Sequence, residues 1–210
     1  ENGSAAPLQN GETLLGWPDY QRGRVAVVFG TLFAPPIRSK TGDWETQTYA
    51  TPDEAHLRYR AQLDAYQRLA GDHPDHFRLI ASRADLQAIL DHWADPLLEN
   101  HPVGLVPLIE GAECVRTPSE VESWWQMGVR ILGPAWGSNR YCGGTAEPGT
   151  LTSDGRLLLK AMAEVGFTLD LSHMDELAAR QALDMYPGPI IASHANVASL
   201  VPGYEGNRLL

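Results

Sequence analysis

Apolar runs of strand length alternate with helical patterns along most of this chain. The runs cover residues 24–33, 103–109, 129–135, 167–172 and 189–193, with a shorter candidate at 77–81. Helix start signals, in which an acidic residue follows a cap residue by three positions, lie between them at Thr51–Glu54, Ser82–Asp85 and Thr117–Glu120. Two further helical patterns cover residues 157–165 and 176–186. Strands that alternate with helices predict β-α-β units and therefore a parallel sheet.

The number of strands leaves two architectures open. Five strands cannot close an eight-stranded barrel, although they could make an open doubly wound sheet, and composition does not choose between the two. With 43% hydrophobic and 20% charged residues, the composition is that of an ordinary globular domain. The sequence contains neither a low-complexity segment nor a clear linker, so we predict one domain over residues 1–210.

The charge balance and the cysteine content limit the partners and the compartment. A net charge of −10 argues against binding to nucleic acid or to an anionic membrane surface. No apolar run approaches the roughly 18 residues that a membrane span needs. The two cysteines, Cys114 and Cys142, form no CxxC motif and favour a reducing cytoplasm over a disulfide framework. The chain starts at Glu1 without an initiator Met, so we expect that its true amino terminus, with any signal peptide, is not visible.

Two strand-like segments near the end of the chain lead into the same dipeptide, Ser-His. Leu169–His173 and Ile190–His194 place their histidines 21 residues apart, which is the length of one strand-plus-helix unit. Glu110 follows a third apolar run in the same topological position. Because the carboxyl ends of parallel strands meet at one edge of the sheet, we expect the three side chains to converge. Two imidazoles and a carboxylate predict a metal site.

Each of these side chains also has an ordinary structural explanation. A histidine after a strand is more often structural than a ligand, but a matched pair with a glutamate in the same position favours the metal site. Asp170 and Ser172 alternate with leucines along the strand before His173. Either one of them orients an imidazole, or Asp170 only satisfies backbone groups in the sheet, and the sequence leaves both readings open.

A glycine-rich segment, Gly133–Thr145, follows the strand predicted at 129–135. It has neither GxGxxG nor GxxxxGK[ST] order, so we interpret it as a loop that covers a substrate, with Trp136 and Tyr141 on its surface; a connecting turn is the alternative. The histidines of Asp72–His76 lie between a helix and a short strand, at the opposite end of the sheet, and are interpreted as part of a solvated loop. The remaining histidines, His56, His92 and His101, receive no role.

An ordered set of motifs resembles the renal (membrane) dipeptidases, a family of zinc peptidases of the amidohydrolase type on a (β/α)8 TIM barrel. The motifs are Ile109–Gly111, Gly128–Leu132, Asp170–His173, Ile191–Asn196 and Asn207–Arg208. The resemblance covers nearly the whole chain and is firmest over residues 103–210. It implies that the chain is part of an α/β barrel, with about five parallel strands from the middle of the eight.

The resemblance also implies a reaction and its residues. The Glu that matches Glu110 bridges two zinc ions and is catalytic, and His173 and His194 match ligands of one of those ions. A hydroxide held between the metals attacks the peptide carbonyl of a dipeptide. Arg208 matches the Arg that receives the substrate carboxylate, and Trp136 stands where many members have a substrate-binding His. An indole donates one hydrogen bond but cannot accept a proton. The resemblance therefore implies metal binding more firmly than it implies which substrate is chosen.

Parts of the family pattern lie outside the chain. The His-x-Asp pair of the first barrel strand has no counterpart, and the late Asp that handles the leaving amine would fall after Leu210. We therefore expect a longer parent protein, and weak or no activity from the isolated 210 residues, whose unclosed sheet would expose edge strands. The alternatives are another metal-dependent amidohydrolase, acting on a cyclic amide or an N-acyl amino acid, and a non-catalytic barrel scaffold. A small peptide substrate and a homodimer are the expected partners.

Overall fold

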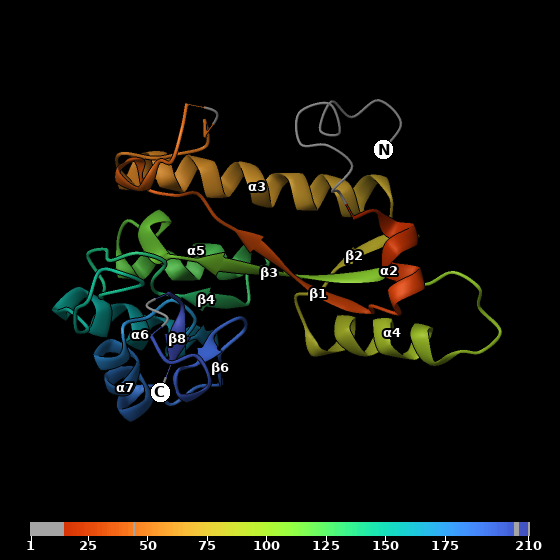
Figure 1. Ribbon diagram of the computed structural model, residues 1–210. Helices are drawn as coiled ribbons and strands as arrows, with labels where there is room; N and C mark the ends of the chain where they lie inside the picture. The colour runs from red at the N-terminus through yellow and green to blue at the C-terminus, as the bar shows by residue number, and fades with distance from the viewer. Residues whose placement is uncertain (1–14, 44, 204–205, 210) are drawn as a thin grey trace.

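The computed structural model describes residues 15–43, 45–203 and 206–209 (Figure 1). The strands are β1 (Val27–Leu32), β2 (Phe77–Leu79), β3 (Val103–Glu110), β4 (Ile131–Gly133), β5 (Thr168–Asp170), β6 (Ile190–Ile191), β7 (Asn196–Val197) and β8 (Arg208–Leu209). The α-helices are α2 (Trp17–Gly23), α3 (Pro52–Asp72), α4 (Arg83–Ala94), α5 (Val121–Gln126), α6 (Ser153–Val165) and α7 (Glu176–Met185). Each predicted apolar run contains one strand, so the predicted alternation is confirmed.

The strands β1 to β6 form one parallel sheet. Its order is β1-β3-β4-β5-β6, and β2 pairs with the amino-terminal part of β3. The long strand β3 therefore pairs with β1 on one side and with β2 and then β4 on the other. Because the strands run in one direction, the carboxyl ends of β3, β5 and β6 lie along the same edge.

One face of the sheet carries the buried core. The register aligns one leucine or isoleucine from each of four strands in a row, and none is exposed: Leu32, Ile109, Leu132 and Leu169. This row packs against buried side chains of α3, α5, α6 and α7, among them Tyr59, Leu63, Trp124, Leu158, Met162 and Ala182. Full burial of each large apolar side chain contributes about 1.5–3 kcal/mol, so this layer is the main source of stability.

The opposite face of the sheet is partly open. Near the start of β3, side chains of Ile80 and Ile89 pack over Gly104, where a larger residue would collide with Ile80. Farther along, Phe29, Val106 and other residues line a groove of about 620 Å³, and Phe29 is 49% exposed. Helices α3, α5, α6 and α7 pack on the core face, whereas α4 covers only the start of β3 on the opposite face, through Ile89. A largely open inner face is the arrangement of part of a barrel wall, whereas a doubly wound sheet is covered on both faces.

Cap residues start the helices where the sequence predicts. The Thr51 hydroxyl caps α3 by accepting the N–H of Glu54 at 3.2 Å, and the Glu54 carboxylate accepts the N–H of Ala50, the residue before the cap, at 2.7 Å. The third signal works differently, because a 3₁₀ turn over Pro118–Glu120 precedes α5 and Thr117 provides no side-chain cap.

Removing the cap of α3 is expected to destabilise the protein moderately. Thr51→Ala should lower the free energy of unfolding by about 1 kcal/mol, because the N–H of Glu54 loses its acceptor. Thr51→Ser keeps the hydroxyl and should retain most of that stability. Urea denaturation followed by circular dichroism measures both variants, and equal values for them would show that the cap contributes nothing.

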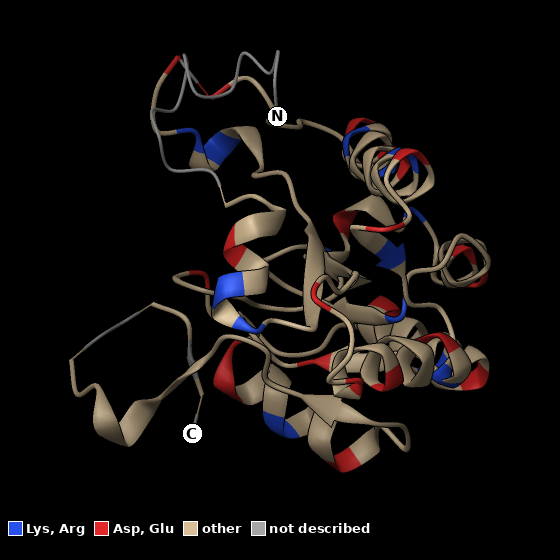
Figure 2. Cartoon of the chain, turned by 90° about the vertical axis from the view of Figure 1, so that its right-hand side faces the viewer, with Lys and Arg blue, Asp and Glu red and all other residues tan. Residues whose placement is uncertain are grey.

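Charged residues of both signs are spread over many segments of the chain, and Lys and Arg are not concentrated in one of them (Figure 2). Several of them form pairs one helical turn apart, such as Arg60 with Asp64 at 3.0 Å and Arg180 with Glu176 at 2.9 Å. Pairs of this kind are exposed and contribute little to stability. Among the described residues, no helix has the length and apolar character required to cross a membrane.

Candidate metal centre

Glu110, His173 and His194 converge at the carboxyl edge of the sheet. Glu110 ends β3, and the two histidines follow β5 and β6. Glu110 Oε1 lies 3.0 Å from His173 Nε2 and 3.3 Å from His194 Nε2, and the two Nε2 atoms are 3.0 Å apart. The structure therefore brings together the three side chains that the strand pattern placed at one edge.

The donor set suits a tetrahedral metal ion. Ligand atoms bound at about 2.0–2.1 Å in a tetrahedron lie about 3.3–3.4 Å from one another, and the three observed separations are close to that value. The side chains of Glu110 and His173 are 15% and 12% exposed, whereas His194 is 44% exposed. Solvent therefore reaches the site from the His194 side, as a catalytic metal centre with an open position requires.

Both imidazoles are held through their other ring nitrogen by a hydroxyl group. Thr145 Oγ1 lies 2.9 Å from His173 Nδ1, and Ser193 Oγ lies 2.7 Å from His194 Nδ1. Contacts of this kind orient a ligand histidine and leave its Nε2 for the metal. The sequence interpretation assigned no role to Thr145 or Ser193, although the repeated Ser-His dipeptide and the end of the glycine-rich segment contained both residues.

Asn207 joins the two turns that carry the histidines. Its Oδ1 accepts the N–H of His173 at 2.7 Å, and its Nδ2 donates to the carbonyl of His194 at 2.9 Å. His173 has a left-handed backbone conformation, with φ of 66°, which costs a non-glycine residue about 1–2 kcal/mol. Asn207 is 8% exposed, and its two hydrogen bonds, one to each histidine turn, stabilise that conformation.

A buried tyrosine fixes the end of β3. Tyr59, on α3, donates its hydroxyl to the backbone carbonyl of Glu110 at 2.7 Å. Burial raises the pKa of Tyr59 well above its usual value, so the phenol remains a neutral donor. The next residue, Gly111, has φ of 83°, and a side chain there would be strained and would stand 3.5 Å from the backbone of Trp136. The backbone around the carboxylate is therefore held from two directions.

The matching family is that of the membrane dipeptidases, peptidase family M19, whose family model covers residues 11–205. The chain belongs to this family. The dipeptidase ataJ from Aspergillus terreus is 30% identical over 179 residues, which cover 71% of this chain and 42% of that protein. An uncharacterized protein of Acinetobacter calcoaceticus, encoded in the PQQ-III 3′ region, is 28% identical and covers 91% of this chain. The chain spans only 64% of that relative's length.

Solved structures of similar fold include dipeptidases. The probable dipeptidase PvdM from Pseudomonas aeruginosa has a TM-score of 0.78 at 20% identity, over 95% of this chain and 50% of that one. A metallo peptidase from Rhodobacter sphaeroides, liganded with a phosphinate mimic of the dipeptide L-Ala-D-Ala, has a TM-score of 0.76 at 19% identity, over 95% and 61% of the two chains. The M19 dipeptidases are TIM barrels, so this chain forms part of such a barrel, as predicted, and not a doubly wound sheet.

Trp136 lies beside the triad in this member of the M19 family. Its ring centroid is 6.2 Å from that of His173 and 5.2 Å from that of Phe33. The indole therefore borders the site, with Phe33 packed against it. The other aromatic residue expected on this loop, Tyr141, is buried in the core, and its hydroxyl donates to the backbone carbonyl of Val115. The expectation of a surface position was wrong for Tyr141. The side chain of Arg208 lies outside the described residues, although its backbone belongs to β8.

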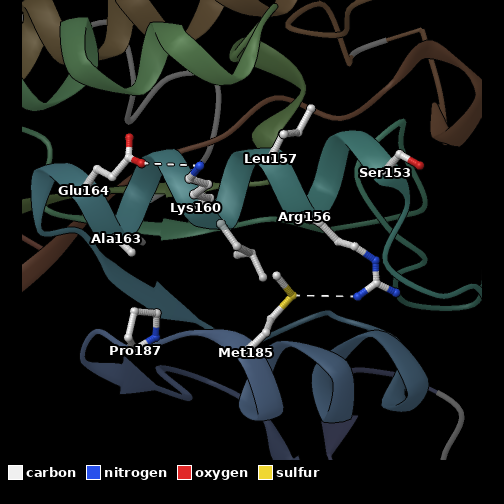
Figure 3. Close-up of a pocket in the computed structure, with 9 residues that line it drawn as sticks. Ser153, Arg156, Leu157, Lys160, Ala163, Glu164, Met185 and Pro187 are labelled. Carbon is white, nitrogen blue, oxygen red and sulfur yellow. Dashed lines mark hydrogen bonds and ion pairs between the residues drawn. The ribbon is translucent and has the colours of Figure 1, made fainter.

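Other histidines and grooves lie away from the triad. His92 and His101, which received no role from the sequence, face each other with their Nδ1 atoms 3.4 Å apart near the end of α4. A groove of about 780 Å³ separates α6 from the end of α7, with Leu157, Lys160 and Met185 among its lining residues (Figure 3). None of the triad residues lines it. The groove lies in the outer layer of helices and is therefore separate from the metal-binding triad at the edge of the sheet.

Proposed function

We propose that the protein is a zinc-dependent dipeptidase in which Glu110, His173 and His194 hold the metal. The convergence of these three donors, with both Nδ1 atoms already occupied by hydroxyl groups, is the observation that carries this proposal. Membership of the M19 family supports metal-dependent hydrolysis of dipeptides. Because the curated relatives are longer than this chain, the proposal concerns the full-length protein.

The residues of the triad have different tasks in this proposal. A bound zinc ion lowers the pKa of a coordinated water to about 7 and polarises the scissile carbonyl. Glu110 turns Oε1 toward both imidazoles and would hold the metal together with them, and its other carboxylate oxygen would remain available to a second ion. His173 and His194 bind through Nε2, and their orientation depends on Thr145 and Ser193.

Substrate contacts in this proposal come from Trp136 and Arg208. The indole, packed on Phe33 and next to His173, offers an apolar surface and one N–H to a dipeptide side chain or carbonyl. It has no group that could take up a proton, so proton transfer must rely on other residues. We assign Arg208 to the substrate carboxylate, which a guanidinium binds with two parallel hydrogen bonds.

Two further properties are part of the proposal. Cys114 and Cys142 are free and buried, which supports a reducing compartment, and we propose the cytoplasm. We also propose a homodimer, which analytical ultracentrifugation of the full-length protein would test directly.

Chelation is expected to remove dipeptidase activity. Prolonged dialysis of the full-length protein against a zinc chelator should lower kcat/KM for a dipeptide by at least about 10²-fold, because the metal supplies the nucleophile and the carbonyl polarisation. Added zinc should restore it. Activity that persists after elemental analysis has verified metal removal would contradict the metal mechanism.

The choice of substrate separates the dipeptidase from the other candidates. A panel of L,L and L,D dipeptides, cyclic amides and N-acyl amino acids should show turnover of dipeptides only; preferred turnover of a cyclic or acylated substrate would identify a different amidohydrolase. Elemental analysis should find about two zinc ions per full-length chain. A protein without bound metal and without turnover would be a barrel scaffold.

A further inference from the structure

The two histidines of the triad are oriented by hydroxyl groups with different surroundings. Next to His173, the Thr145 hydroxyl can turn to either proton arrangement, because a hydroxyl both donates and accepts. Next to His194, the Ser193 hydroxyl also contacts the carboxylate of Asp170. The proton of Ser193 therefore has a charged acceptor, an imidazole nitrogen and, at the longer distance of 3.4 Å, the hydroxyl of Ser172 as possible partners.

Asp170 is buried and receives three hydrogen bonds. Its side chain is 1% exposed, and Oδ1 accepts the backbone N–H groups of Ser172 at 3.1 Å and Ser193 at 3.0 Å. Oδ2 accepts the hydroxyl of Ser193. A buried carboxylate that accepts hydrogen bonds from donors on both oxygens is acceptor-only, so it fixes the direction of every bond it makes.

This direction determines the tautomer of His194. Because Ser193 gives its only hydroxyl proton to Asp170, Ser193 Oγ has only lone pairs to offer to His194 Nδ1. The neutral imidazole must then carry its proton on Nδ1, and Nε2 keeps a free lone pair toward Glu110. We propose that Asp170, acting through Ser193, is a positioning residue that holds His194 in its metal-binding tautomer, an inference that rests on the proposed metal site.

An amide at position 170 would reverse this hydrogen-bond chain. In Asp170→Asn, the amide oxygen must stay where Oδ1 is, because two backbone N–H groups point at that atom. The NH₂ group then faces Ser193 Oγ and donates to it. Ser193 then turns its proton toward His194 Nδ1 at 2.7 Å, its nearer acceptor, because Ser172 Oγ lies 3.4 Å away. The imidazole proton therefore moves to Nε2 and blocks the position that binds the metal.

The proposal predicts an unusual order of metal affinities in the full-length protein. Asp170→Asn should weaken zinc binding by about 10–100-fold, in the range observed when the partner of a ligand histidine is lost. Ser193→Ala removes the chain without reversing it, so it should weaken binding less. The double variant Asp170→Asn with Ser193→Ala should bind zinc better than Asp170→Asn alone. Competition with a fluorescent zinc chelator measures all three, with Asp184→Asn, an exposed carboxylate on α7, as the matched control.

The tautomer itself gives a readout that does not require metal. In metal-free protein labelled with ¹⁵N-histidine, at about pH 8 where a free imidazole is neutral, long-range ¹⁵N–¹H spectra should show His194 protonated on Nδ1. Asp170→Asn should move that proton to Nε2, and the signals of His173, whose Nε2 lies 3.0 Å from that atom, should respond as well. A thermal unfolding curve checks that each variant is folded. If Asp170→Asn does not fold, the same measurements on Ser193→Ala still test the hydrogen-bond chain.

The outcomes separate this inference from the proposed function. An unchanged His194 tautomer in Asp170→Asn, or a double variant that binds zinc more weakly than Asp170→Asn, would overturn the role of Asp170. A wild-type protein that binds no zinc but has His194 protonated on Nδ1 would overturn the metal centre and leave the hydrogen-bond chain intact.

Discussion

Glu110→Gln is expected to lower kcat/KM for a dipeptide by about 10³-fold or more in the full-length protein, a loss of about 4 kcal/mol in transition-state stabilisation. The amide has nearly the size of the carboxylate but lacks its charge, and only its oxygen can act as a ligand. Glu110 lies within 3.3 Å of the Nε2 atoms of both His173 and His194, so the change alters the whole donor set. Zinc content, measured by elemental analysis, should fall together with activity.

Glu113→Gln provides the matched control on the same turn. Glu113 is three residues farther along the chain and half-buried, and burial raises the pKa of its carboxyl group. An amide there removes a charge that burial already disfavours, so activity and zinc content should stay near the wild-type values. A similar loss in both variants would mean that Glu110 acts through general electrostatics or folding and not as a ligand.

Trp124→Ala is expected to lower the free energy of unfolding by about 3–5 kcal/mol, because it removes the largest of the fully buried side chains from the layer between sheet and helices. That loss is a large part of the about 5–15 kcal/mol by which a typical domain is stable. Guanidinium denaturation monitored by circular dichroism gives the value. A loss below 1 kcal/mol would show that the cavity collapses or that this layer is loosely packed.

Trp124→Phe distinguishes the contribution of volume from that of the indole N–H. Within the described part of the chain, Trp124 Nε1 is buried without a hydrogen-bond partner. A buried donor without an acceptor is unfavourable. Phenylalanine removes this donor, and that gain in stability offsets part of the stability lost with the smaller side chain. The phenylalanine variant should therefore lose clearly less stability than the alanine variant.

Most of the fold could be predicted from local patterns. The cap residues Thr51 and Ser82 predicted the starts of α3 and α4, because a cap depends on residues only three positions apart. Strand lengths were less predictable: the run at 129–135 contains only the three-residue β4, since pairing with β3 and β5 decides which residues enter the ladder. Thr117 has the sequence of a cap but does not cap a helix, because a 3₁₀ turn intervenes before α5.

The convergence of the triad could also be predicted, because parallel strands bring their carboxyl ends to one edge. The surrounding contacts could not. Thr145 and Asn207 reach His173 from segments 28 and 34 residues away, and no spacing rule predicts where loops of that length return. For Asp170 the sequence left two roles open, and the hydrogen bonds show that it accepts backbone N–H groups and also contacts Ser193. The backbone role is therefore observed, and the orienting role is the one proposed above through Ser193.

The bridge made by Asn207 has a consequence for the order of events during synthesis. His173 and His194 leave the ribosome before Asn207, which follows them by 34 and 13 residues. At about 5–20 residues per second, the first histidine is made about 2–7 s before the side chain that holds its strained backbone. A nascent chain that ends before Asn207 therefore has all three donors of the triad. It lacks the side chain whose amide joins the two histidine turns.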